Sequence, residues 1–435
     1  MKQFSRWALT GVLFTGCGGY ERRSLDVLTV LQELTSQTPE ALARDKAPGG
    51  KFDLADGLDL REGEALSLVM SPALRAARLR AGVARTVADA PVGSPNPTLE
   101  LDAAGIVEDV PAPWQLGVGL QFTFPVSGRL SAETERGEAA HRSAVLAVAV
   151  DERETVARVR EAWIEWSVAA RRVDLLTAHR ERLVAIERVA KRLSEAGELD
   201  PADSGLIAVS VAALDTRTVG LRSDASLRRA HVLALLGLVA DAPVTLVTTL
   251  PENVPVAPTD KQLAKHPKAL AALAVFDEAE AGLALVVAGR NPDVSVGPKV
   301  EHDAGRWAVG ASASIPLPFL DRSERRIAEA RGNSDLARAA VATALQGLRE
   351  QRFMATTMLA GASDLRRSVV EILSPVLKAQ LARSQTLIEA GEVQVLLLER
   401  LLEESLVGEE TLLNADRQAA LAHALLLSLQ PEVSP

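Results

Sequence analysis

Apolar and polar residues alternate with a period of two in two segments of the chain, residues 116–124 and 307–315. Such alternation over about ten positions places one set of side chains on each face of a β-strand. Residues 98–107 and 293–302 precede these segments, alternate less cleanly, and are the expected partner strands. The pattern fits a membrane β-barrel strand, whose apolar face meets lipid, and it fits a half-buried hairpin of a soluble protein equally well. In the membrane alternative, the lipid-facing side chains include Leu116, Val118, Leu120, Phe122, Trp307 and Val309.

A stretch of about 65 to 70 residues with helical character follows each predicted strand pair. The two stretches cover residues 128–197 and about 321–391, and Pro375 is the one strong helix breaker inside them. At about 1.5 Å per residue, each helix would be a rod near 100 Å long, a length that calls for coiled-coil packing. The first rod ends at Gly197, and Asp200-Pro201 then starts a returning helix, so the pattern predicts a helical hairpin.

The first of these long helices carries the apolar seam of a coiled coil. Its apolar residues are spaced alternately by three and four positions, which places them along the side of the helix that faces a neighbour. The seam shifts phase once, near its middle. Its residues are Val156, Val159, Trp163, Trp166, Ala170 and Val173, followed by Leu183, Ile186, Ala190 and Leu193. A soluble coiled-coil rod would explain these helices but not the paired strands.

The order of helix, two strands and long hairpin occurs twice. Pro72 recurs 195 residues later as Pro267, and Trp114 recurs as Trp307. The Glu-Ala-Gly-Glu sequence at the end of the first rod recurs letter for letter at the end of the second. Repetition at one long period indicates two copies of a structural module. We therefore divide this part of the chain into a first repeat, a proline-rich linker and a second repeat, at residues 61–240, 241–262 and 263–430.

The amino terminus has the features of a secretory signal. Two basic residues precede a short apolar run at residues 7–14, which is too short to span a bilayer. Small residues follow, and then Cys17, the only cysteine in the chain. Cys17 lies where a bacterial lipoprotein signal has its acylated residue, although an ordinary signal with an incidental cysteine would also fit. We expect residues 1–16 to be the signal and residues 17–60 to form a lipid-anchored arm.

Composition narrows the classes of function. The formal net charge is −9, and removal of the two basic signal residues gives −9 − 2 = −11. No basic stripe for nucleic acid is present, and no run near 20 apolar residues predicts a transmembrane helix. The six histidines have no metal-ligand spacing, and phosphate-loop and catalytic motifs are absent. We therefore expect neither an enzyme, nor a cofactor, nor a metal site. Aromatic residues make up only 3% of the chain, which is few for the girdles of a membrane barrel.

Several motifs, taken in order, resemble the bacterial outer-membrane efflux protein family typified by TolC, over about residues 60 to 430. The motifs are Glu64-Ala65, Ser71-Pro72-Ala73-Leu74-Arg75-Ala76-Ala77, the strand starts Asn96-Pro97 and Asn291-Pro292, Ala313-Ser314-Ile315-Pro316-Leu317, and Arg192-Leu193-Ser194-Glu195-Ala196-Gly197. The heavy-metal cation efflux branch is the most similar. Its features are residues 315–322 and 327–330, together with Pro375 upstream of the second Glu-Ala-Gly-Glu.

The resemblance implies an α+β membrane protein that is a homotrimer in the bacterial outer membrane. Four strands per chain would close a short twelve-stranded β-barrel, and the long α-helical coiled-coil hairpins would form a second barrel through the periplasm. The hairpin tips would meet a periplasmic adaptor protein, which connects to an inner-membrane pump, with an RND-type pump as the leading candidate. The tip residues implied are Arg192, Glu195, Gly197, Glu198, Glu389, Gly391 and Glu392.

Two functions of different class follow. The first is a passive export duct, the outer-membrane channel of a tripartite efflux system, for metal cations or small toxic compounds. The second is a non-conducting periplasmic scaffold lipoprotein, which the low aromatic content favours. Within the first, a channel for type I protein secretion is a further alternative, because the inner-membrane pump and not the duct selects the substrate.

Overall fold

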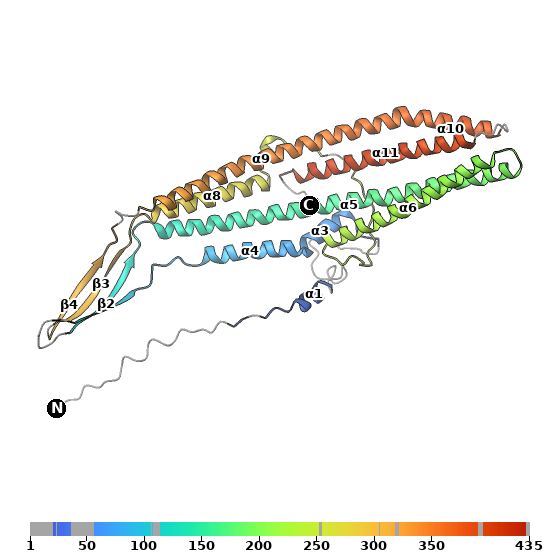
Figure 1. The fold of residues 1–435 in the computed structure, drawn as a ribbon. Helices are drawn as coiled ribbons and strands as arrows, with labels where there is room; N and C mark the ends of the chain where they lie inside the picture. Colours follow the sequence, from blue (N-terminus) through green and yellow to red (C-terminus); the bar gives the residue numbers. More distant parts are fainter. Residues whose placement is uncertain are drawn as a thin grey trace.

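The computed structural model describes most of the chain after the amino-terminal segment (Figure 1). Cys17, Gly391 and Glu392 lie outside the described residues, and the side chain of Glu389 is likewise not described. A short helix, α1 (Val27–Thr35), precedes the repeats. The described residues are 21–22, 24–35, 56–105, 107, 114–251, 255–303, 305–317, 322–389 and 395–431.

The two predicted repeats are present as two sets of helices and strands in the same order. The first set is α3 (Leu60–Met70), α4 (Pro72–Asp89), β1 (Thr98–Gly105), β2 (Trp114–Phe124), α5 (Arg129–Glu195) and α6 (Pro201–Leu235). The second set is α7 (Asp260–Leu263), α8 (Pro267–Ala288), β3 (Val294–Asp303), β4 (Arg306–Ser314), α9 (Glu324–Arg367), the π-helical turn η1 (Ser368–Leu373), α10 (Ser374–Glu389) and α11 (Val395–Ser428). Each predicted strand is found within two residues of its expected ends.

Equivalent residues begin equivalent helices in the two repeats. Pro72 and Pro267 are each the first residue of a helix, α4 and α8, where a proline loses no intrahelical hydrogen bond. Gly128 and Ser323, also 195 residues apart, precede the long helices α5 and α9. Both have left-handed backbones, with φ of 76° and 58°. The turn from strand into long helix is therefore the same in both copies, although only the first copy has the glycine that this conformation favours.

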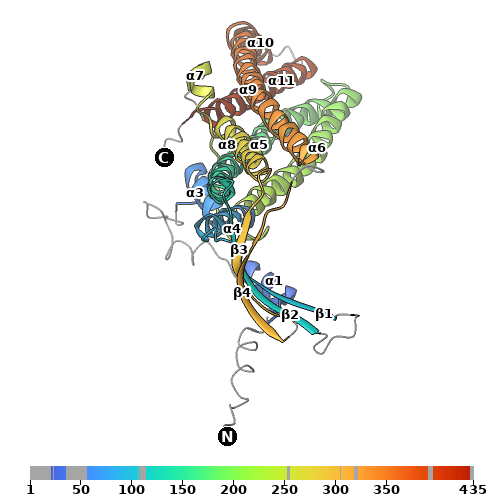
Figure 2. The ribbon, with the colours of Figure 1, turned by 90° about the vertical axis from the view of Figure 1, so that its left-hand side faces the viewer.

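The four strands form one antiparallel sheet in the order β1-β2-β3-β4 (Figure 2). The central pair, β2 and β3, joins the two repeats, with Val118 opposite Val300 and Phe124 opposite Val294. Strands β1 and β4 are the two edges of the sheet. Each therefore has a row of backbone N–H and C=O groups with no strand partner within the described part of the chain.

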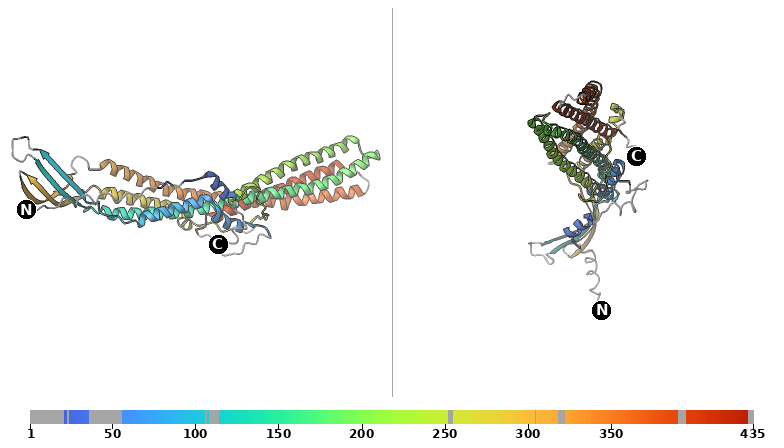
Figure 3. Two further views of the ribbon diagram at one scale, coloured as in Figure 1. Left: turned by 90° about the horizontal axis from the view of Figure 1, so that it is seen from below. Right: turned by 90° about the vertical axis from the view of Figure 1, so that its right-hand side faces the viewer.

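The helices continue the strand order away from the sheet (Figures 1 and 3). Nearest the sheet, α4 packs on α5, α5 on α8, and α8 on α9. Farther along the molecule, α6 packs on α5, α5 on α11, and α11 on α9 and α10. The elements of the first repeat thus lie along one edge of the molecule at every level, and those of the second repeat lie along the other edge.

Six of the ten predicted seam residues of α5 are buried, and the other four, Val156, Ala170, Val173 and Leu193, are half-buried. Trp163 and Val159 are fully buried, and they pack with α3 and the end of α6 in the largest hydrophobic cluster. Trp163 also donates a hydrogen bond from Nε1 to the carbonyl of Val247, 3.0 Å away, which holds the linker against the helix. Leu183 and Ala190 pack in a second cluster nearer the hairpin end. The phase shift between the two groups corresponds to a change of neighbours along α5.

The second long helix differs from the single rod that the sequence predicts. It begins at Glu324 instead of about residue 321, and the six residues of η1 interrupt its α-helical hydrogen bonding. The N–H of Ser374 donates to the carbonyl of Val369, five residues back. Pro375 follows directly and has no N–H for the ordinary bond to the carbonyl of Glu371. The wider turn lets the chain pass this proline without ending the helix.

One helix of the described residues, α6, is long and apolar enough to cross a membrane by length and composition alone. The sequence has no run near 20 apolar residues, so no such helix is predicted from it. Because α6 forms an antiparallel hairpin with α5 and buries Ile207, Val211 and Leu214, its apolar character is explained in part by helix packing. Its opposite face remains exposed.

Candidate functional site: the sheet and the hairpin ends

One face of the sheet is apolar across all four strands. The register places Leu101 beside Val118, Val118 beside Val300, and Val300 beside Val309, so that one apolar row crosses the sheet. The exposed side chains of this face have between 38% and 81% of their surface accessible. They are Leu99, Leu101, Leu116, Val118, Leu120, Phe122, Phe124, Val296, Trp307 and Val309. The six side chains predicted to face lipid all lie on this face. An exposed apolar surface of this extent marks a site of contact with another apolar phase or partner.

The aromatic residues of the sheet lie near its two ends. Trp114 and Trp307 are exposed on the apolar face at the end far from the helices, at 63% and 74%. Phe122 and Phe124 lie at the end that joins α5. Ten residue steps along β2 span about 33 Å, and a strand tilt of about 40° reduces this to about 25 Å, the height of the apolar band of an outer-membrane barrel. Four of the fourteen aromatic residues of the chain thus lie near the two ends of the sheet, where such a barrel needs them.

The opposite face of the sheet is polar and carries an ion-pair group. The Lys299 ammonium lies 2.8 Å from a carboxylate oxygen of Asp102 and 2.8 Å from one of Glu301. The lysine side chain passes over Gly117, where a Cβ would approach its Cε to 3.3 Å. The charged residues of the four strands all lie on this face: Glu100, Asp102, Glu301 and Asp303 against Lys299 and Arg306. Their sum is 2 − 4 = −2, so this face is net acidic.

The end of the α5–α6 hairpin is a Schellman turn. Gly197 has φ of 76° and donates its N–H to the carbonyl of Ser194, and the N–H of Glu198 donates to the carbonyl of Leu193 at 2.9 Å. This confirms the predicted left-handed glycine cap. Arg192, Glu195 and Glu198 are exposed around the turn. In the second hairpin, α10 ends at Glu389, and the remaining predicted tip residues lie outside the described part of the chain.

Ion pairs that the sequence does not predict hold α11 to the first hairpin. The Glu165 carboxylate on α5 accepts from Nε of Arg417 on α11 at 2.8 Å, and it lies 3.1 Å from Arg228 on α6. Nearer the hairpin end, Arg217 on α6 lies 2.7 Å from Glu410 on α11. Exposed pairs contribute little singly, but Glu165 is mostly buried and joins three helices. No periodicity within one helix could have identified partners that come from separate repeats.

The carboxyl end of α11 is held at the middle of the molecule. Arg153 donates to the carbonyls of Gln430, Ser428 and Pro431, the last at 2.7 Å. His266 lies against the same end, with its Nε2 2.9 Å from the Ser428 carbonyl and its Nδ1 accepting from the N–H of Lys268. Burial lowers the pKa of both Arg153 and His266. An arginine at a helix carboxyl end satisfies carbonyls that have no intrahelical partner.

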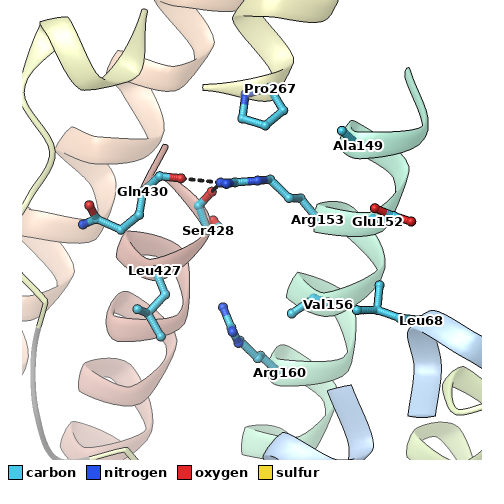
Figure 4. Close-up of a pocket in the computed structure, with 10 residues that line it drawn as sticks. All are labelled: Leu68, Ala149, Glu152, Arg153, Val156, Arg160, Pro267, Leu427, Ser428 and Gln430. Atoms are coloured by element: carbon cyan, nitrogen blue, oxygen red, sulfur yellow. Dashed lines mark hydrogen bonds between the residues drawn. The ribbon is translucent and has the colours of Figure 1, made fainter. Parts of the chain in front are cut away.

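A cavity of about 440 Å³ lies beside this contact (Figure 4). Arg153 points from α5 toward Gln430, and the aliphatic side chains of Val156 and Leu427 line the space between the helices. Because Arg160 is paired with Glu64 and Arg153 with backbone carbonyls, both guanidinium groups along the cavity serve the fold. The geometry is that of a structural junction between the repeats.

Residues 65–237, which make up most of the first repeat, match the family model described as outer membrane efflux protein. Over this range the chain is similar to the outer membrane efflux proteins. No curated protein matches the chain. The matched range ends at Gly237, and the second repeat reproduces the same elements beyond it.

Several solved structures have a similar fold over most of the chain. The outer membrane protein VceC of Vibrio cholerae aligns with 85% of this chain and 95% of its own, at 17% identity and a TM-score of 0.68. The outer-membrane channel OprN aligns with 96% of this chain and 99% of its own, at 18% identity and a TM-score of 0.69. CusC aligns with 95% and 98%, at 15% identity and 0.68. At these identities the likeness establishes the fold of the chain.

Among the described residues, no group of three or more His, Cys, Asp or Glu side chains is placed to hold a metal ion. His179 is buried on α5, and burial lowers its pKa. The features with a clear physical role are the two-faced sheet, the long hairpins and their charged ends.

Proposed function

We propose that this chain is the outer-membrane duct of a three-component efflux system and that it works as a homotrimer. The observation that carries the proposal is the open sheet, with one exposed apolar face, one acidic polar face and two unpaired edges. Strands can cross lipid only when every backbone group is paired. Three copies would pair β1 of one chain with β4 of the next and close twelve strands, with the apolar face toward lipid and the polar face around the lumen.

The long hairpins would extend the duct into the periplasm, where their ends would meet an adaptor protein. Support comes from the exposed charges at the first hairpin end, Arg192, Glu195 and Glu198, and from the repetition of Glu-Ala-Gly-Glu at 389–392. We propose an inner-membrane pump of the RND type as the third component. The duct itself would be passive.

For the substrate, we propose metal cations ahead of other small toxic compounds. The motifs that resemble the heavy-metal cation efflux branch support this choice, as does the net acidic polar face of the sheet. Growth on graded metal salts tests it, in a strain that lacks its own channel and carries the matching pump and adaptor. If this chain restores growth on organic toxicants but on no metal salt, the metal assignment is wrong.

We propose that Cys17 is acylated and anchors the mature chain to the outer membrane. Each methylene group buried in the bilayer adds about 0.8 kcal/mol to the affinity for the membrane, so an anchor of two or three acyl chains binds the membrane firmly. Metabolic labelling with a fatty acid should mark the wild type and not Cys17→Ser. Label that persists in Cys17→Ser would assign the acyl group to another position.

Two measurements on the purified protein test the duct. In mild detergent it should have the mass of a trimer, and in planar bilayers it should conduct ions. A charge on the apolar face, Leu120→Arg, should cost roughly 2 to 4 kcal/mol near the bilayer midplane and prevent insertion. Gly119→Ser is the matched control on the polar face, where an added Cβ meets only ordinary contacts, the nearest at 3.5 Å.

The second candidate function is a non-conducting periplasmic scaffold lipoprotein. It predicts a protein that remains monomeric in mild detergent, gives no conductance, and tolerates Leu120→Arg as well as Gly119→Ser. The aromatic residues near both ends of the apolar face favour the duct, because a scaffold in water has no use for them.

A further inference from the structure

His179 is a buried polar residue inside an otherwise apolar contact between helices. Its side chain is on α5 and has 4% of its surface exposed. The residues one turn to either side, Leu176 and Leu183, belong to the apolar cluster that α5 forms with α6 and α11, which also contains Leu406 of α11. A leucine at position 179 would continue this cluster. The imidazole therefore interrupts the apolar packing where α11 lies against the first hairpin (Figure 1).

The imidazole also lacks a hydrogen bond that a buried ring normally makes. Nδ1 of His179 is buried and has no hydrogen-bond partner within the described residues. A buried polar atom loses its hydrogen bonds to water, and here no described protein group replaces them. The contact between α5 and α11 is therefore weaker with this histidine than it would be with a leucine.

The charged groups around His179 are already paired with one another. They are Arg172, Arg180 and Arg182 on α5, Asp215 and Arg217 on α6, and Arg400, Glu403, Glu409 and Glu410 on α11. The three glutamates lie close enough to act on the imidazole, and each has an arginine within 3.4 Å. A proton on His179 would therefore add a buried positive charge for which these groups offer no unpaired carboxylate. A buried charge without a partner is unfavourable.

The packed contact accordingly holds the neutral form of the ring. Burial lowers the pKa of His179 and Arg182 lowers it further, whereas Glu409, Glu403 and Glu410 oppose the shift. Once α11 has moved away and water reaches the ring, the pKa returns toward the ordinary value of about 6.5. The stability that the neutral ring gives the contact is thus full above about pH 6.5. It is lost as the pH falls through the lower pKa of the packed state.

The rest of the chain confines a separation of these helices to the hairpin end of the molecule. Glu165 lies 14 residues before His179, or about 21 Å along α5. It is mostly buried and accepts from Arg417 of α11 at 2.8 Å. These ion pairs would remain as a pivot when α11 leaves α5 on the side of the hairpin ends. Helix α10 packs mainly on α11 and η1, so it would move with α11.

We propose that protonation of His179 separates α11 from α5 between Glu165 and the hairpin ends, so that acid moves the second hairpin away from the first. The inference rests on the proposed duct, in which this movement would widen the periplasmic mouth. The duct would then conduct more in mild acid than at neutral pH.

Distances between spin labels test the movement. The pair Ala185→Cys and Val407→Cys labels exposed positions on α5 and α11 at the level of the contact. In trimers with one labelled chain, this distance should lengthen between about pH 7 and about pH 5. The control pair joins Ala185→Cys to Val209→Cys, an exposed residue of α6 in the same hairpin, and its distance should stay constant. An equal or shorter distance in acid for the first pair would overturn the inference.

Replacement of the titrating ring should remove the effect. Each unit by which the packed state lowers the pKa of His179 shifts the equilibrium toward separation by up to about tenfold in acid. His179→Leu fills the apolar seam and His179→Gln keeps a neutral polar side chain, so both should hold the first label pair at its neutral-pH distance. His266→Asn removes the other buried histidine of lowered pKa and should respond like the wild type. A response that persists in both His179 variants, or that disappears in His266→Asn, would assign the movement to another group.

Conductance separates this inference from the proposed duct. Wild-type trimers in planar bilayers should conduct more in acid, and trimers of His179→Leu should lack this increase. If the trimer conducts but the His179 variants share its pH profile, the inference fails and the duct stands. A protein that stays monomeric in mild detergent and gives no conductance would contradict the duct and the inference together.

Discussion

The ammonium of Lys299 lies 2.8 Å from the carboxylate of Asp102 although their strands, β3 and β1, are separated by β2. The contact is possible because the β2 residues opposite them are glycines, Gly117 beside Asp102 and Gly119 beside Lys299. A Cβ at Gly117 would lie 3.1 Å from an Asp102 oxygen. The glycines on the polar face of β2 therefore make room for a lysine that lies flat on the sheet and projects little into the proposed lumen.

Removal of the lysine charge should raise the preference of the channel for cations. Lys299→Gln leaves Asp102 and Glu301 without their shared partner. One unit charge acts on a passing ion about 8 Å away in water with roughly 0.5 kcal/mol, which corresponds to about a twofold change in permeability ratio. Reversal potentials in a salt gradient measure this ratio. Lys299→Arg should leave it unchanged, and Asp102→Asn should shift it toward anions. If none of these variants changes the permeability ratio, this face does not line the pore.

Gly297→Ala should disrupt the pairing of the two repeats. A Cβ on Gly297 would lie 1.7 Å from the Leu120 carbonyl oxygen of the neighbouring strand, so backbone has to move. We expect the free energy of unfolding to fall by about 1 to 3 kcal/mol, the usual cost of overpacking. Gly310→Ala is the matched control on β4, where a Cβ meets nothing within 4 Å. The temperature at which the assembled protein dissociates on a gel should fall for the first variant only. If the two variants dissociate at the same temperature, the strands can separate at this point without a loss of stability.

Ser323→Gly should be more stable than Ser323→Ala by about 1 kcal/mol. Ser323 has φ of 58° and its hydroxyl accepts from Arg326 at 2.7 Å. Both variants lose this hydrogen bond, but glycine also removes the cost of a left-handed backbone, roughly 1 kcal/mol. Chemical unfolding of the two variants measures the difference. At the equivalent position, Gly128→Ala should be destabilising by a similar amount, and a neutral Gly128→Ala would contradict the shared turn.

The buried His266 should make the protein less stable in mild acid. Its Nδ1 accepts the N–H of Lys268 and so must be unprotonated, and burial lowers its pKa below the ordinary value of about 6.5. The unfolded chain therefore binds the proton more readily. The stability that the neutral histidine contributes is fully present above about pH 6.5 and is lost as the pH falls through the lower folded pKa.

His266→Asn separates this effect from other titrations. Asparagine is a good helix cap that does not titrate, so the variant should lose less stability than the wild type between about pH 7 and pH 5. Part of the decline should remain, because burial also lowers the pKa of His179. Thermal unfolding across this pH range measures the difference. If the stability of the two proteins falls equally with pH, His266 does not cause the loss of stability in acid.

The hairpin ends should be required for export but not for assembly. Gly197→Pro cannot adopt the φ of 76° that the turn needs, and Gly391→Pro changes the repeated sequence of the second end. We expect both variants to reach the outer membrane as trimers and to lose efflux, measured as resistance in a strain without its native channel. Full resistance with both variants would exclude the ends as the adaptor contact.

The elements that depend on local spacing could be predicted from the sequence. The period-two pattern located β2 and β4, and the helix that begins after Gly128 and ends before Gly197 was predicted to within two residues. Leu183 and Ala190 are buried as the seam requires. The internal duplication supported these predictions, because each sequence pattern occurs twice and in the same order.

The features that the sequence did not predict depend on contacts between distant segments. Lys299 and Asp102 are 197 residues apart, and Glu165 and Arg417 are 252 apart. Such partners are set by the sheet register and by helix packing, which no single segment encodes. The π-helical turn was missed for a different reason. Pro375 is visible in the sequence, but a proline inside a helix can end it, kink it or widen one turn, and the neighbouring helix decides among these.

The π-helical turn occurs in only one of the two hairpins of each chain. The turn packs against Gly408 of α11, where a Cβ would lie 3.3 Å from Leu373, while the equivalent part of α5 is an uninterrupted α-helix. A ring of three proposed copies would therefore contain six hairpins that alternate between a stiff form and a form with a weak point. If the periplasmic mouth widens, every second hairpin would bend outward while the uninterrupted hairpins between them stay in place. The opening would then have threefold and not sixfold symmetry.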